Sequence, residues 1–159
     1  MVAHQNARRA DAEQRLRELA IKLPAPPQPF GVYVEAVQAG NLLFLAGMLP
    51  TEGREAKFIG RIGAEIDVET GQKAARLAAL NGLAVARQHL GSLDKVTRIV
   101  RLGVSVATSG DVRDQPKVAD GASELLQDVS EKTRTLAAWC MASQAFHSAP
   151  RSSWKSSSR

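Results

Sequence analysis

The residue types that carry metal or thiol chemistry are scarce in this sequence. It contains three histidines, His4, His89 and His147, whose spacing matches no metal-ligand pattern. Its single cysteine, Cys140, cannot form an internal disulfide or a multi-cysteine zinc site. The sequence therefore predicts a protein that holds no metal.

The positive net charge of the chain, +5, is concentrated near its C-terminus. Residues 131–159 contain five basic side chains and one acid, whereas residues 1–130 contain 16 basic and 15 acidic ones. Binding through phosphates needs clustered Lys and Arg, so this near-neutral body argues against nucleic acid as a partner. No segment has the ~20 apolar residues of a membrane span, and the first residues lack the apolar core of a secretory signal. We therefore expect a cytoplasmic protein that does not bind membranes.

Hydrophobic patterning predicts a small sheet within the first 130 residues. Strands are expected at residues 32–37, 42–45, 57–62 and 100–106. The first two are joined by a tight turn at residues 39–41, which read Ala-Gly-Asn. The last of them alternates apolar and polar or small residues, as a strand with one buried face does.

Two long helices are expected to cover one face of this sheet. The first spans residues 68–90, where Asp67 can cap the N-terminus and Gly91 can end the helix. The second begins near Pro116, a residue suited to a first helical turn. A shorter helix follows Asp11, a good N-cap. These elements predict a single two-layer α+β domain with a small mixed sheet and two main helices on one face.

Two segments of the sequence carry a family resemblance. Residues 31–37 read G-V-Y-V-E-A-V and residues 40–50 read G-N-L-L-F-L-A-G-M-L-P. Together they resemble the RidA/YjgF pattern G-x-Y-x-x-A-V…G-N-L-[LV]-F-[VIL]-S-G-Q-[LIV]-P, and the similarity spans roughly residues 12–129. The chain is most similar to the branch labelled endoribonuclease L-PSP or chorismate-mutase-like. Ala46 and Met48 stand where the pattern has Ser and Gln, which removes two polar groups near the family's cleft.

The resemblance implies a chorismate-mutase-like fold, a homotrimer with clefts between subunits, and a small-molecule substrate. The implied activity is the hydrolysis of reactive 2-imino acids to 2-keto acids and ammonia, with no metal or cofactor. In the family an arginine on the penultimate strand holds the substrate carboxylate, a tyrosine lines the cleft, and a glutamate near the C-terminus positions water. Tyr33 matches that tyrosine, so we expect it to bind substrate. The alternative is a non-catalytic trimer that binds small molecules or associates with RNA as a regulator.

Residues 131–159 depart from the family's usual ending. Relatives read like G-R-H-A-R-S-A-V-G-V-A-S-L-P and then V-E-V-E-A-I-F-E, whereas this chain ends W-K-S-S-S-R. One choice of codons for residues 134–139 regroups to H-A-R-S-V, and the same shift of frame turns the last residues into V-E-I-V-F-E. We interpret the tail as frame-shifted, and a divergent or vector-derived end is the alternative. Such a tail is expected to supply no closing strand and to be irregular and exposed from about residue 144.

The family's carboxylate-binding arginine is missing from its place in this tail. Arg134 is the candidate nearest to that place, although a solvated charge explains it better. Cys140 falls where some members have a thiol, and an accident of the shifted frame explains it better than catalysis. Three further arginines are expected on solvated or trimer-facing surfaces: Arg76, Arg87 and Arg101. The chain as written is therefore expected to have impaired activity.

Overall fold

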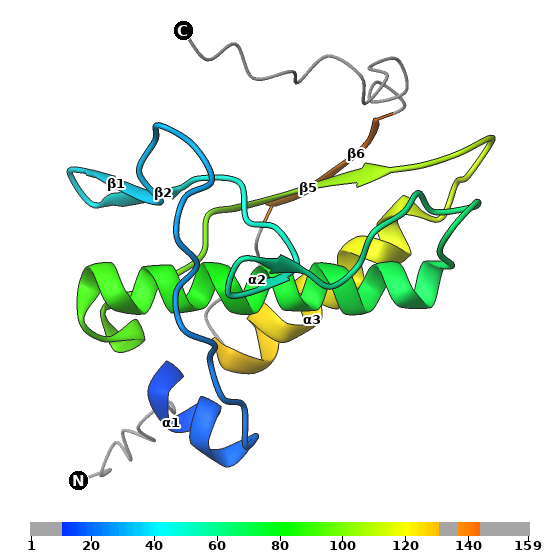
Figure 1. Cartoon of the computed structure of the whole chain (residues 1–159). Coiled ribbons are helices and arrows are strands. Elements are labelled where there is room, and N and C mark those ends of the chain that lie inside the picture. The colour runs from blue at the N-terminus through cyan, green and yellow to red at the C-terminus, as the bar shows by residue number, and fades with distance from the viewer. Residues whose placement is uncertain (1–10, 131–136, 144–159) are drawn as a thin grey trace, which may run out of the picture.

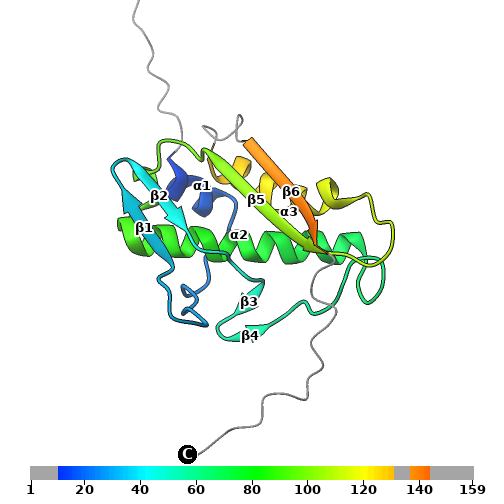
Figure 2. The same cartoon turned by 90° about the horizontal axis from the view of Figure 1, so that it is seen from above.

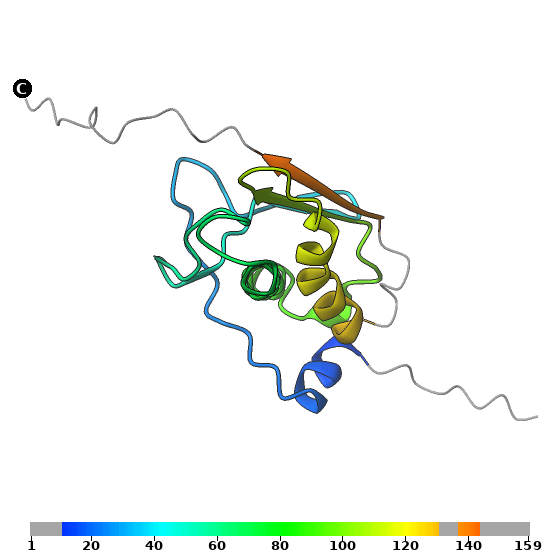
Figure 3. The same ribbon diagram turned by 90° about the vertical axis from the view of Figure 1, so that its right-hand side faces the viewer.

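The computed structural model of the protein describes residues 11–130 and 137–143. The strands at residues 36–39, 42–45, 101–107 and 137–143 lie on one side of the two long helices, and the short helix α1 (Ala12–Glu18) lies on the other side (Figures 1 and 3). The small hairpin at residues 51–56 lies beside the first long helix. Within the described residues, no helix is both long and apolar enough to span a bilayer. The two-layer α+β architecture expected from the sequence is confirmed.

Helix α2 (Val68–Leu90) begins and ends at the residues that the sequence indicates. The side chain of Asp67 accepts a hydrogen bond from the Thr70 amide at 2.7 Å, which satisfies a donor that the first turn leaves free. At the other end Gly91 has φ +82°, and its N–H donates to the Arg87 carbonyl. Glycine adopts this left-handed conformation without steric cost, so the helix ends there.

Helix α3 (Gln115–Val129) lies beside α2 and crosses it closely (Figure 2). Its apolar face is buried, as the spacing of its residues predicts: Val118, Ala122, Leu125 and Val129. At the crossing, a Cβ atom built on Gly121 would lie 2.1 Å from the Gln72 carbonyl oxygen of α2. The two helix backbones are therefore in direct contact, and only glycine fits between them.

The strands form three two-stranded units instead of one continuous sheet. Strands β1 (Ala36–Ala39) and β2 (Leu42–Leu45) make an antiparallel hairpin, and Gly40 takes φ +58° in its turn. A second small hairpin joins β3 (Thr51–Glu52) to β4 (Glu55–Ala56). The expected strand at 32–37 therefore begins only at residue 36. The expected strand at 57–62 is wrong, since only Ile62 of that segment forms isolated bridges.

The third unit pairs β5 (Arg101–Ala107) in parallel with β6 (Ala137–Ser143). The expectation that residues 131–159 supply no strand is therefore wrong for residues 137–143. All seven residues of β5 have partners in β6, so the backbone of β5 is paired along that whole edge. Arg134 and the expected irregular segment from residue 144 lie outside the described residues.

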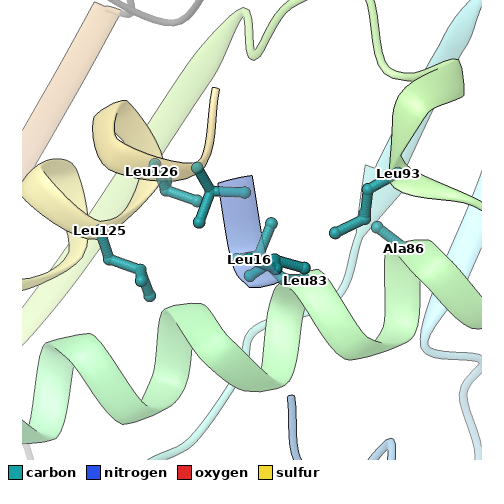
Figure 4. Close-up of a cluster of buried hydrophobic side chains, with 7 residues drawn as sticks. Leu16, Leu83, Ala86, Leu93, Leu125 and Leu126 are labelled. Carbon is teal, nitrogen blue, oxygen red and sulfur yellow. The ribbon is translucent and has the colours of Figure 1, made fainter. Parts of the chain in front are cut away.

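The core lies between the helices and the inner face of the strands. Its larger cluster brings together α1, α2, α3 and the short 3₁₀ helix η1 (Leu93–Lys95); Figure 4 labels Leu16, Leu83, Ala86, Leu93, Leu125 and Leu126. Leu102 of β5 packs against it, and Val104 and Val106 belong to a second cluster near the other end of α2. The alternation of β5 thus buries one face of the strand, as expected.

The outer face of the β1–β2 hairpin carries exposed apolar side chains. Val37 and Phe44 face each other across the two strands and are 53% and 57% exposed. Leu42, on the same face as Phe44, is 49% exposed. Exposed apolar side chains gathered on one face are typical of interaction surfaces.

Candidate active site

A small pocket lies between the proline-rich segment that precedes β1 and the segment that follows β2. Its walls are residues 27–30, Tyr33 and Glu35 on one side, and residues 46–49 with Thr51 on the other. The structure therefore brings Tyr33 together with Ala46 and Met48, the two positions where the sequence departs from the family pattern. We call this cavity the Tyr33 pocket.

Two sets of hydrogen bonds to backbone carbonyls fix the walls of the Tyr33 pocket. The Ala46 amide donates to the Glu35 carbonyl at 2.9 Å, which extends the hairpin pairing by one step beyond β1 and β2. The buried side chain of Asn81 on α2 donates to the carbonyls of Leu49 and Thr51, each at 2.9 Å. Because a buried amide that lost these acceptors would carry a desolvation cost, the contact anchors the pocket wall to the helix.

Tyr33 lies just before β1, with its hydroxyl at the pocket wall. The Phe30 amide donates to the Tyr33 hydroxyl oxygen at 3.3 Å. A hydroxyl that accepts this bond can still donate its own proton to a ligand. Tyr33 is 48% exposed, so a ligand can reach it from solvent.

Glu35 is the acidic side chain among the residues that line the pocket, and the sequence analysis did not single it out. It is half-buried, and its carboxylate forms no hydrogen bond or ion pair with any residue that the structure describes. A carboxylate with free acceptor sites beside a hydroxyl can take a proton from a bound water. The sequence does place Glu35 two residues after Tyr33, inside the motif that carries the family resemblance, and this position could have suggested it as a site residue.

A cation lies near the same pocket and was also missed. Arg54, in the turn between β3 and β4, has its guanidinium carbon 5.9 Å from the centroid of the Phe30 ring, which lines the pocket. This arrangement fits a cation–π contact. Arg134, the candidate from the sequence, lies outside the described residues, so the structure does not test it.

Cys140 lies away from the Tyr33 pocket, in β6 and against α3. Its thiol donates to the Gln115 carbonyl, with a sulfur–oxygen distance of 3.3 Å. Burial raises the pKa of the Cys140 thiol above its ordinary value. At neutral pH the side chain is therefore a protonated thiol, which is a poor nucleophile.

The Tyr33 pocket of a single chain is small. Its free volume is about 20 Å³, which is room for one water molecule. A three- or four-carbon acid does not fit inside it, so a substrate has to lie at its mouth. Among the described residues, no three His, Cys, Asp or Glu side chains converge in a way that could hold a metal ion.

The fold and this pocket define a class, a small two-layer α+β domain with a tyrosine-lined cavity beside a β-hairpin. Residues 13–143 match the family described as "YjgF/chorismate_mutase-like, putative endoribonuclease", and the chain belongs to that family. The match extends beyond residue 130 and includes β6.

Individual proteins agree with the family assignment. The chain is 40% identical over 114 residues to Protein TCP17 of Trypanosoma cruzi, which covers 72% of this chain and 71% of that protein. It is similar to the crystal structure of "a putative endoribonuclease" from Shewanella oneidensis MR-1, with TM-score 0.76 and 30% identity over 82% of this chain and 88% of the other. Atu1372 of Agrobacterium tumefaciens, a protein described as having unknown function, gives TM-score 0.74 and 34% identity over 83% and 82% of the two chains.

Proposed function

We propose that this protein hydrolyses reactive 2-imino acids to 2-keto acids and ammonia at the Tyr33 pocket. The observation that carries the proposal is that Tyr33 and the unpaired carboxylate of Glu35 line one pocket in a chain of this family. Imines are electrophilic, so the protein has to supply little more than orientation, a base and water. The water-sized cavity beside both side chains suits the placing of that water.

In the proposed reaction Glu35 acts as the general base. It takes a proton from water as the water oxygen bonds to the imine carbon, and the electron pair of the C=N double bond moves to nitrogen. Glu35 gives that proton to nitrogen, which completes a carbinolamine. It then takes the proton of the new hydroxyl and passes it to the same nitrogen as the C–N bond breaks, so that ammonia leaves and the oxygen electron pair forms the keto C=O bond. The Tyr33 hydroxyl donates a hydrogen bond to the substrate carboxylate, and Arg54 adds a positive charge near the same pocket.

The C-terminal segment limits this activity in the proposal. We interpret residues 134–139 and the last residues of the chain as shifted in frame, with residues 141–143 resembling the in-frame V-A-S of relatives, and this shift removes the family's carboxylate-binding arginine. Arg54 is a weaker substitute because its guanidinium lies over a ring at the surface instead of inside the cleft. A chain continued in the shifted frame, ending in V-E-I-V-F-E, would regain that arginine and a C-terminal glutamate.

The activity is tested by ammonia release from 2-aminoacrylate or 2-iminobutanoate generated in situ. The chain as written should accelerate release above the uncatalysed rate, and the chain continued in the shifted frame should be faster still. The control is the same protein after heat denaturation. If both chains are inert on a panel of 2-imino acids, the non-catalytic binding or RNA-associated function takes the place of this proposal.

We also propose that the protein assembles as a homotrimer through the outer face of the β1–β2 hairpin. That face exposes Val37, Leu42 and Phe44, and a partner that covers it would remove apolar surface from water. Assembly would also enlarge the cleft at the mouth of the small Tyr33 pocket.

Light scattering at micromolar concentration should therefore give three times the mass of one chain. Phe44→Glu should give monomers, because a carboxylate would have to be buried against apolar side chains. Gln127→Glu, at an exposed position of α3, is the matched control and should remain trimeric. A wild-type monomer would contradict the proposed assembly.

A further inference from the structure

A larger hollow, which shares no lining residue with the Tyr33 pocket, lies between the β3–β4 hairpin and α2. Its volume is about 440 Å³, within the range of small-molecule sites. From α2 it is lined by Lys73, Arg76, Leu77 and Leu80, whose spacing places them on one stripe of the helix. We call it the α2 groove.

The wall facing α2 comes from the hairpin and the residues after it. It consists of Glu52, Lys57 and Phe58. The contacts of Asn81 with the carbonyls of Leu49 and Thr51 hold the start of this hairpin against α2. The packing of the hairpin against α2 therefore fixes the shape of the groove, which is open to solvent.

Every charged side chain that lines the α2 groove forms an ion pair with a described residue, except one. Lys57 forms ion pairs with Glu52 at 3.1 Å and with Glu55 at 3.2 Å. Lys73 forms one with Glu69 at 2.8 Å. These two lysines and three glutamates sum to a single negative charge. The ion pairs raise the pKa of both lysines.

Arg76 is the exception. It is half-buried in the groove, and no residue that the structure describes forms a hydrogen bond or ion pair with its guanidinium. A guanidinium offers a planar set of donors that matches a carboxylate, and its pairing is strongest where water is partly excluded. The side chains beside it are Phe58, Leu77 and Leu80, which are apolar and only partly buried.

From this arrangement we infer that the α2 groove binds a small amphipathic carboxylate, with its carboxylate on Arg76 and its hydrocarbon part on Phe58, Leu77 and Leu80. A dianion is disfavoured because Glu52 and Glu69 lie close to the lysines that would otherwise receive a second charge. This site is separate from the Tyr33 pocket and goes beyond the proposed reaction.

The probe for this site is octanoate, with binding measured by isothermal titration calorimetry. Arg76→Gln should weaken binding at least tenfold, whereas Arg17→Gln, which removes the same charge from α1, should leave it unchanged. Affinity should rise up to about fourfold for each CH₂ group from butanoate to octanoate, because each buried methylene adds the free energy of its transfer out of water. Octanol, which lacks the charge, should bind at least tenfold more weakly than octanoate.

Binding of octanoate should persist in Tyr33→Phe, and this separates the groove from the proposed active site. The inference is overturned if wild-type protein does not bind octanoate at millimolar concentration, or if Arg76→Gln and Arg17→Gln bind equally well. Loss of octanoate binding in Tyr33→Phe would also overturn it, since the carboxylate would then occupy the Tyr33 pocket. The first two of these results would leave open whether the protein hydrolyses imines at the Tyr33 pocket.

Discussion

Gly121→Ala is expected to lower the free energy of unfolding by about 3 kcal/mol, the upper part of the range for overpacked cores. The new Cβ would lie 2.1 Å from the carbonyl oxygen and 2.8 Å from the carbonyl carbon of Gln72. Both are backbone atoms, so no side chain can rotate away and α3 has to move off α2. That movement disturbs the core that α3 shares with the other helices. Urea denaturation followed by far-UV circular dichroism measures the change.

Gly82→Ala is the matched control, because Gly82 is also a helical glycine in the same layer. A Cβ there would meet only the side chains of Leu45 and Met48, each at 3.7 Å, which is ordinary van der Waals contact. Alanine favours a helix over glycine by up to about 1 kcal/mol, so this variant should be neutral or more stable. If the two variants changed stability equally, the close approach of the helices would not explain the effect.

Glu35→Gln is expected to lower kcat for ammonia release about 100-fold, a typical loss for a general base. Glutamine keeps the shape of the side chain and its carbonyl acceptor, but it cannot take a proton from water. KM should change little, because Glu35 does not hold the substrate in the proposed reaction. Steady-state kinetics on 2-iminobutanoate generated in situ separates the two parameters. Tyr33→Phe should have the opposite pattern, with a higher KM and a smaller loss of kcat.

Glu124→Gln, at an exposed position of α3, controls for the loss of one negative charge. It should retain the wild-type kcat. Full activity in Glu35→Gln would place the base elsewhere and contradict the proposed role of Glu35. The circular dichroism spectra of all three variants should match the wild type, which excludes unfolding as the cause.

The helices could be predicted closely from the sequence because their ends depend on local chemistry. Asp67 caps the first residues of α2 through its own side chain, and Gly91 adopts a conformation that few other residues tolerate. The strands were harder to predict, since pairing depends on partners far along the chain. Residues 57–62 have strand-like composition, yet most of the segment is exposed loop, and only Ile62 forms isolated bridges, to Ile66 and to Thr108 just after β5.

The prediction that the C-terminal segment supplies no strand is wrong at β6. Residues 137–143 read A-A-W-C-M-A-S, a nearly continuous run of apolar residues, which is also typical of a buried parallel strand. The prediction of no strand considered only the alternating pattern of a strand with one buried face, and residues 137–143 do not have that pattern. The pairing with β5 uses backbone groups, so it tolerates side chains that differ from those of the family.

The candidate site was predicted in part. The motif indicated Tyr33, and the structure places it beside Ala46 and Met48 as the resemblance implied. Glu35 and Arg54 could not be identified in the same way. Glu35 becomes a candidate only once its carboxylate is seen to lack a partner, and Arg54 reaches the pocket through a turn that composition does not reveal.

The most direct test of the Tyr33 pocket uses the fact that Tyr33 is the only tyrosine of the chain. Protein labelled with ¹³C-tyrosine gives NMR signals from this ring alone, and 2-oxobutanoate, a product of the proposed reaction, can be titrated against it. We expect the Tyr33 ring signals to shift and to saturate with the ligand, and the shift to be reduced in Arg54→Gln. Unchanged Tyr33 signals at concentrations where saturation-transfer NMR detects bound 2-oxobutanoate would contradict the assignment of this pocket as the active site.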